Sequence, residues 1–156
     1  MYPVRLAQLL LGNDLTVAGA VLRDNPARGV DLSGQALLVS GSGVPVSVHF
    51  GFEHAYGSRY TLWGSAGRLH LDRAFTPPAS WQPVLRIEEQ DHAEEHVLAA
   101  DDQFLRSMES FTEAVRSGRT ALDAEEAAGL RDTVRTMELV DDIRRLAVRV
   151  TTGSPP

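Results

Sequence analysis

The chain has 156 residues, a formal net charge of −6 and no cysteine, and all 15 of its basic residues are arginine. The missing cysteine excludes disulfides, thiolate zinc sites and a cysteine nucleophile, and the missing lysine excludes a catalytic amine from this chain. An acidic balance argues against nucleic acid as a partner, and no apolar run approaches the roughly 20 residues of a membrane span. Arg5 interrupts the N-terminal apolar run, so no signal peptide is expected and we predict a cytoplasmic protein.

The first third of the chain predicts one helix followed by strands. Residues 2–11 carry Pro3 in the first turn and a leucine stripe, which favours a helix. Strands are expected at 15–23 and 30–40. Apolar and polar residues then alternate over 44–52, the cleanest period-two pattern in the chain, which predicts a strand with one buried face.

Tight turns separate the next short apolar runs and predict antiparallel hairpins. These runs cover 58–63, 67–72, 84–89 and 95–98.

The last third predicts two helices. The first begins at Asp101 or Asp102 and ends at Gly118, and its apolar residues recur at helical spacing. The second follows Asp123 and Glu126, which have the spacing of a capping box.

These elements predict an α+β fold with an open, mostly antiparallel sheet of about six strands. The N-terminal helix and the two C-terminal helices are expected to pack on one face of the sheet. We predict a single domain over 1–148 and a flexible tail at 149–156.

Two motifs partly match the signatures of cofactor or metal sites. The glycine-rich stretch 41–43 lacks the third glycine of a dinucleotide fingerprint and lies between two strands, so a turn is expected there. His92, Glu95 and His96 match H-x-x-E-H, a zinc-hydrolase signature that requires a helix. In an extended chain the two imidazoles would lie about 13 Å apart, so we predict no metal and keep a zinc-dependent hydrolase as the weakest alternative.

Aromatic and basic residues gather within 50–60. Arg59 suits a phosphate, and the rings of Tyr56 and Tyr60, with His54 nearby, suit a sugar. The competing interpretation is an aromatic cluster at a strand edge, with Arg59 in solvent.

The stretch 60–69, Y-T-L-W-G-S-A-G-R-L, resembles the y-x-i-x-G-t-x-G-x-l hairpin in the C-terminal domain of Gfo/Idh/MocA oxidoreductases. The helix start at 100–104 fits the same family, and the similarity extends over about 2–146. Residues 50–59 and 71–78 are most similar to the branch of NDP-hexose 3-ketoreductases.

This resemblance implies hydride transfer from NADP or NAD to a keto group of a nucleotide-linked sugar, in deoxysugar biosynthesis. In the family a Rossmann domain holds the glycine-rich loop and a catalytic lysine, and neither is in this chain. We therefore expect the isolated chain to bind no nicotinamide cofactor and to be inactive. The family's sheet commonly packs on another subunit, which implies a homo-oligomer through the sheet.

The resemblance also assigns site residues. Tyr2 falls at the family's catalytic acid position. The candidates for substrate binding are Arg5, His54, Tyr56, Arg59 and Tyr60. The main alternative is a stand-alone, non-enzymatic module that binds a sugar or another subunit.

Overall fold

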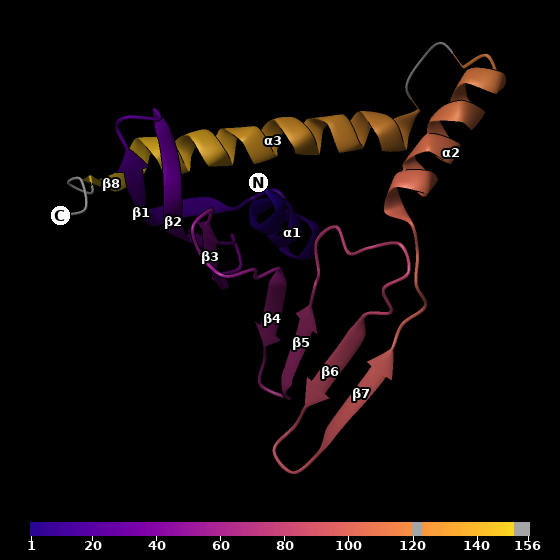
Figure 1. The fold of residues 1–156 in the computed structure, drawn as a ribbon, viewed down its shortest axis with the longest axis horizontal. Helices are drawn as coiled ribbons and strands as arrows, with labels where there is room; N and C mark the ends of the chain where they lie inside the picture. The colour runs from indigo at the N-terminus through magenta and orange to yellow at the C-terminus, as the bar shows by residue number, and fades with distance from the viewer. Residues whose placement is uncertain (120–122, 152–156) are drawn as a thin grey trace. The chain divides into compact units, whose positions relative to one another are not determined.

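The structure is a computed structural model that describes residues 1–119 and 123–151 (Figure 1). Three helices and seven of the eight strands lie within about two residues of the predicted bounds, and the α+β class is confirmed. The elements are α1 (Tyr2–Leu11), β1 (Thr16–Asn25), β2 (Val30–Val39), β3 (Pro45–Gly51), β4 (Arg59–Trp63), β5 (Arg68–Asp72), β6 (Val84–Glu88), β7 (Ala93–Val97), α2 (Gln103–Arg116), α3 (Ala124–Leu146) and β8 (Ala147–Thr151).

The strands form two four-stranded sheets, where the sequence predicted one sheet of about six strands. The sheets belong to two compact units. The first unit contains α1, β1, β2, β3, α3 and β8, and the second, within Ala55–Ala121, contains β4 to β7 and α2. The pattern of one strand specifies its buried face but not its neighbours, so it could not reveal that the sheet is interrupted between β3 and β4.

The first sheet has the order β3-β2-β1-β8. Its first three strands are antiparallel, whereas β8 runs parallel to β1, with Ala147 opposite Ala20. The strand β8 was not predicted. Residues 149–151, assigned to a flexible tail from the sequence, lie in this strand because their backbone pairs with β1. The remaining tail residues, 152–156, lie outside the described residues.

The helices α1 and α3 cover one face of the first sheet and bury its core. The described core combines residues of both helices and of two strands, and each fully buried leucine contributes about 1.5–3 kcal/mol. The core residues are Val4, Ala7, Leu15, Leu22, Ala36, Leu38, Leu139 and Ile143. The third helix, α2, lies in the second unit and buries no residue, so the prediction of three helices on one face is right only for α1 and α3.

The second sheet is an antiparallel meander of the order β4-β5-β6-β7. Its first turn is the predicted hairpin, closed by a hydrogen bond from the Gly64 amide to the Gly67 carbonyl at 2.9 Å. A Cβ at Gly67 would lie 2.5 Å from the carbonyl oxygen of Glu88, so the close approach of β6 requires glycine there.

In the described part of the chain, no helix has both the length and the apolar character needed to cross a bilayer.

Candidate functional site

The six predicted site residues divide between the two units. Tyr2 and Arg5 lie on α1, and His54 follows β3, all in the first unit. The other three candidates belong to the second unit: Tyr56, Arg59 and Tyr60. The aromatic and basic segment predicted as one cluster therefore spans the boundary between units.

Tyr2 and Arg5 are one helical turn apart at the start of α1, so their side chains are neighbours on one helix face. Tyr2 is 55% exposed as a whole residue. The guanidinium of Arg5 donates a hydrogen bond to the carboxylate of Asp132 on α3, at 3.3 Å. Arg5 therefore also holds α1 against α3.

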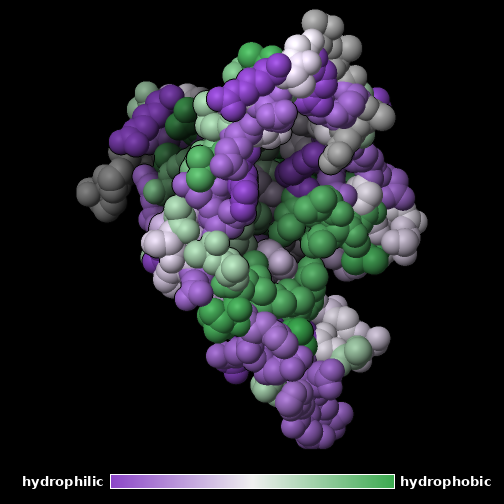
Figure 2. Space-filling view, turned by 90° about the vertical axis from the view of Figure 1, so that its right-hand side faces the viewer, coloured by the Kyte–Doolittle hydropathy of each residue, from purple (hydrophilic) through white to green (hydrophobic). Residues whose placement is uncertain are grey.

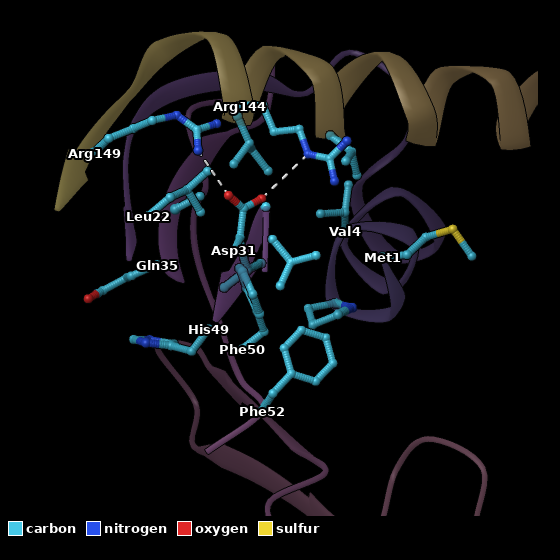
Figure 3. A pocket seen from close by; sticks show the side chains of 17 residues that line it. Met1, Val4, Leu22, Asp31, Gln35, His49, Phe50, Phe52, Arg144 and Arg149 are labelled. Carbon is cyan, nitrogen blue, oxygen red and sulfur yellow. Dashed lines mark hydrogen bonds and ion pairs between the residues drawn. The ribbon is translucent and has the colours of Figure 1, made fainter. Parts of the chain in front are cut away.

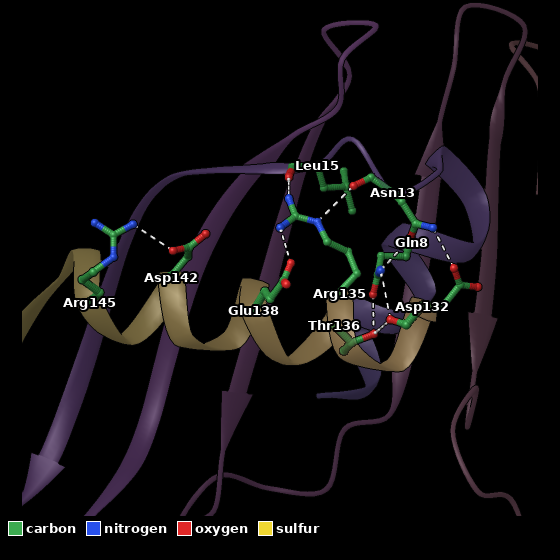
Figure 4. A network of polar contacts seen from close by, with 9 residues as sticks. All are labelled: Gln8, Asn13, Leu15, Asp132, Arg135, Thr136, Glu138, Asp142 and Arg145. Atoms are coloured by element: carbon green, nitrogen blue, oxygen red, sulfur yellow. Dashed lines mark hydrogen bonds and ion pairs between the residues drawn. The ribbon is translucent and has the colours of Figure 1, made fainter. Parts of the chain in front are cut away.

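A polar network fixes α1 on α3 (Figure 4). The buried amide of Gln8 donates to the side-chain oxygen of Asn13 at 2.8 Å and lies 3.3 Å from the backbone carbonyl of Asp132. The buried hydroxyl of Thr136 is within hydrogen-bonding distance of the side-chain amide oxygen of Gln8 and of the backbone carbonyl oxygen of Asp132, and its single hydrogen serves one of them at a time. The network orients the helix that presents Tyr2.

His54 lies over the end of β3. A Cβ at Gly51 would lie 2.1 Å from Nδ1 of the His54 ring, so this glycine makes room for the imidazole. Phe50 and Phe52 form an edge-to-face pair nearby in sequence, with ring centroids 6.1 Å apart. The predicted aromatic character of this strand end is present.

A pocket of about 690 Å³ lies within the first unit (Figure 3). Its walls come from the start of α1, from β2 and β3, and from the second half of α3, and they are mainly apolar. Lining residues include Met1, Pro3, Val48, Phe50 and Ile143. None of the six predicted residues lines it, although Tyr2 stands between two residues that do.

At the polar end of this pocket, arginine side chains are paired with aspartate carboxylates. Asp31 accepts from Arg149 at 2.9 Å and lies 3.6 Å from Arg144, and Figure 3 shows the two guanidinium groups reaching one carboxylate. Arg149 also pairs with Asp24 at 2.7 Å, and this hydrogen bond lowers the pKa of the Asp24 carboxyl. Because the cations have carboxylate partners, the pocket suits a weakly polar ligand better than a phosphate.

In the second unit, the aromatic and basic candidates lie at the start of β4. Tyr60 is opposite Leu71, and Arg59 is opposite Asp72 at the end of β5. The next residue, Arg73, places its guanidinium over the ring of Tyr56. The sequence analysis did not assign Arg73, although it noted the segment 71–78.

The H-x-x-E-H segment has the wrong geometry for a zinc site. Ala93–Val97 is the strand β7, and the imidazole of His96 lies 3.3 Å from the carboxylate of Glu94. No group of three potential ligands gathers anywhere in residues 1–119 and 123–151. The zinc-hydrolase alternative therefore loses the helical face on which it depends.

The stretch 41–43 forms the turn between β2 and β3, as predicted. A dinucleotide loop needs a strand that leads into a helix, so this turn does not have the required geometry.

Comparison with known proteins finds that the chain is similar to part of several reductases. No protein-family model matches it. Two curated relatives are both named dTDP-3,4-didehydro-2,6-dideoxy-alpha-D-glucose 3-reductase. The relative from Actinomadura kijaniata is 48% identical over 92% of this chain and 42% of its own length, and that from Streptomyces violaceoruber is 50% identical over 94% and 44%. The chain thus spans less than half the length of these relatives.

Solved structures are similar to the chain as well. KijD10, a 3-ketoreductase from Actinomadura kijaniata in complex with NADP, has a TM-score of 0.89 at 45% identity, over 97% of this chain and 47% of that one. A D-galactose-1-dehydrogenase from Rhizobium etli, at 16% identity and a TM-score of 0.65, shares the fold alone. The chain is similar to these 3-ketoreductases over nearly all of its own length, and it corresponds to under half of such a protein.

Proposed function

We propose that this chain is the substrate-binding and oligomerisation domain of an NADP-dependent oxidoreductase that reduces a keto group on a nucleotide-linked sugar. The observation that carries the proposal is 48–50% identity to two named 3-reductases over more than nine-tenths of the chain. The same relationship is supported by the TM-score of 0.89 to an NADP-bound 3-ketoreductase.

The cofactor and the catalytic amine come from elsewhere in the whole protein. This chain contains no lysine and no complete glycine-rich fingerprint. We infer that a Rossmann domain supplies both and that this chain alone neither binds NADPH nor catalyses the reaction. Because such a reaction uses NADPH and a soluble sugar nucleotide, we propose a cytoplasmic location.

The exposed stripe on α2 supports a further protein partner. Apolar side chains recur along one face of this helix and each is more than half exposed: Phe104, Met108, Phe111 and Val115. The side of the molecule drawn in Figure 2, which includes α2, carries several apolar areas. We assign the Rossmann domain as the cover of this stripe, because exposed apolar areas of this kind mark interfaces.

Tyr2 is the proposed acid. NADPH, when it is bound, supplies the hydride that is transferred to the keto carbon. The Tyr2 hydroxyl then donates its proton to the carbonyl oxygen as negative charge develops there. Tyr2 is 55% exposed at the start of α1. Substrate contacts are proposed for Arg5, His54, Tyr56, Arg59 and Tyr60.

The second candidate function is a non-enzymatic module that binds a sugar or another subunit. The observation that favours it is the outer face of the first sheet, opposite α1 and α3, where Val21, Leu37 and Val148 are each more than 40% exposed. Under the reductase proposal, the same face is explained as a contact between two copies of the chain.

A chimera tests the reductase proposal. The chain is joined to the dinucleotide-binding portion of the Actinomadura kijaniata reductase, and NADPH oxidation is followed with a dTDP-linked 3-keto sugar. We expect turnover, and we expect Tyr2→Phe to lower kcat by about 100-fold or more with little change in KM, since a general acid contributes on that scale. The matched control is Leu9→Ala, an exposed position on the same helix.

An inactive but folded chimera that still binds the sugar nucleotide would favour the non-enzymatic module. Full activity of Tyr2→Phe would remove the assigned acid.

A further inference from the structure

The guanidinium of Arg73 lies over two aromatic rings in the second unit. Its Cζ is 4.4 Å from the ring centroid of Trp81 and 5.6 Å from that of Tyr56. Tyr56 precedes β4, Arg73 follows β5, and Trp81 lies in the connection to β6. Three separate segments therefore contribute to one cation–π cluster.

The loop that presents Arg73 is held in a set conformation. The amide of Ala74 donates to the carbonyl of Ser58 at 2.8 Å, and the amide of Phe75 donates to the Ser58 hydroxyl at 3.0 Å. Arg73 and Thr76 have φ values of 49° and 50°. Such left-handed values are uncommon for residues with a side chain and recur at binding sites, where the surrounding structure holds them.

The stacked guanidinium keeps its hydrogen-bond donors. A cation–π contact is made through the charge of the guanidinium and leaves its five N–H groups available as hydrogen-bond donors. The side chain of Arg73 makes no ion pair or hydrogen bond within residues 1–119 and 123–151, although the chain has more carboxylates than cations. Even the carboxylate of the adjacent Asp72 pairs with His70, at 3.1 Å.

Arg86, on a strand of the second sheet, shows the usual arrangement of an arginine paired with carboxylates. Its guanidinium pairs with Glu88 at 2.8 Å and with Glu95 at 3.5 Å. A half-buried arginine that is oriented by two rings and lacks a carboxylate is instead arranged to receive an oxyanion.

We propose that Arg73, held between Tyr56 and Trp81, binds the diphosphate of the sugar-nucleotide substrate. The exposed ring of Tyr56 offers the adjacent base or sugar a stacking face. This inference rests on the proposed function and deepens it, because it assigns the phosphate contact to a residue outside the six candidates. The shared chemistry is a phosphate oxyanion, which NADP also carries, so the test separates the two sources.

The experiment measures nucleotide binding by the full 156-residue chain. Trp63 is 87% exposed and is replaced by Phe, so that the remaining tryptophan, Trp81, reports on its own cluster. This protein is titrated separately with dTDP, thymidine, pyrophosphate and NADP, and fluorescence is checked by calorimetry. We expect dTDP and pyrophosphate to change the Trp81 emission, and thymidine and NADP to have little effect.

Variants identify the group that binds. Arg73→Gln is expected to weaken dTDP binding by roughly tenfold or more, which is the scale of a lost charged hydrogen bond. Arg73→Lys keeps the charge but loses the two-pronged geometry and is expected to recover only part of the affinity. Arg86→Gln is the matched control with the same charge change and should bind dTDP normally. Thermal melts confirm that each variant is folded.

Three results would overturn the inference: no dTDP binding at millimolar concentration, an affinity of folded Arg73→Gln within twofold of the parent, or an Arg73-dependent response to NADP instead of dTDP. Each leaves the proposed function to its own test, because the chimera would still turn over. Loss of turnover with Arg73-dependent dTDP binding intact would instead contradict only the reductase proposal.

Discussion

Arg149 ties three strands together through two carboxylates. It stands on β8 and reaches Asp24 on β1 at 2.7 Å and Asp31 on β2 at 2.9 Å. The hydrogen bond from Arg149 is the main reason that the pKa of Asp24 lies below its ordinary value of 3.8. The same arginine closes the polar end of the pocket, so one side chain serves both the sheet and the pocket.

This contact predicts a pH-dependent contribution to stability. A carboxyl whose folded-state pKa is depressed stabilises the fold fully above its unfolded pKa, and this contribution declines as pH falls below 3.8 and is lost below the folded-state pKa. We expect Asp24→Asn to lower the melting temperature at about pH 7 and to leave it nearly unchanged when the pH is below the folded-state pKa. Melting curves across the acid range measure this difference.

Asp91→Asn, an exposed position in the turn before β7, serves as the control and should follow the parent at every pH. If the melting temperatures of the parent and of Asp24→Asn fall in parallel through the acid range, Asp24 does not cause the pH-dependent loss of stability.

At the scale of elements, the sequence predicts local features well but does not predict which strands pair. The capping box of Asp123 and Glu126 is present at the start of α3, because a cap depends on residues three positions apart. By contrast, β8 exists because Ala147–Thr151 pairs with β1, more than 100 residues earlier, and the sequence of these five residues does not reveal that partner. The division into two sheets is non-local in the same sense.

The candidate site follows the same division. Tyr2 could be proposed because it falls at the acid position that the family resemblance implies, and Arg5 lies in the same short stretch of sequence. Arg73 could not, because its partners Tyr56 and Trp81 come from other segments and become neighbours only when β4, β5 and β6 pair.

The outer face of the first sheet predicts self-association. Val21 lies opposite Val148 on this face, and both are exposed. We expect the chain to form a dimer through it and Val21→Asp to yield a monomer, because a carboxylate would be buried at the contact. Light scattering on the eluting protein measures the mass.

The exposed stripe of α2 provides the control for this prediction. Phe111→Asp places the same charge on that helix and should leave the dimer intact. If Phe111→Asp is a monomer and Val21→Asp is still a dimer, the dimer contact lies on α2 and not on the first sheet.

At the scale of the whole molecule, the chain is a domain that corresponds to 42–44% of each of two curated 3-reductases. Its two units carry different parts of the proposed site. The first contains the proposed acid, Tyr2, and an apolar pocket. The second contains Arg73, the proposed diphosphate contact, next to aromatic rings. The cofactor and the lysine belong to the Rossmann domain that we propose for the complete protein.

The central claim is that this domain holds a keto sugar for hydride transfer from a nicotinamide. The chimera is supplied with NADPH deuterated at the transferring position of the nicotinamide ring and with a dTDP-linked 3-keto sugar, and the product is weighed by mass spectrometry and its labelled carbon located by NMR. We predict one deuterium, bound to the carbon that carried the keto oxygen. A folded chimera that consumes NADPH but leaves the sugar unlabelled, or that binds the sugar nucleotide and never reduces it, would contradict the account.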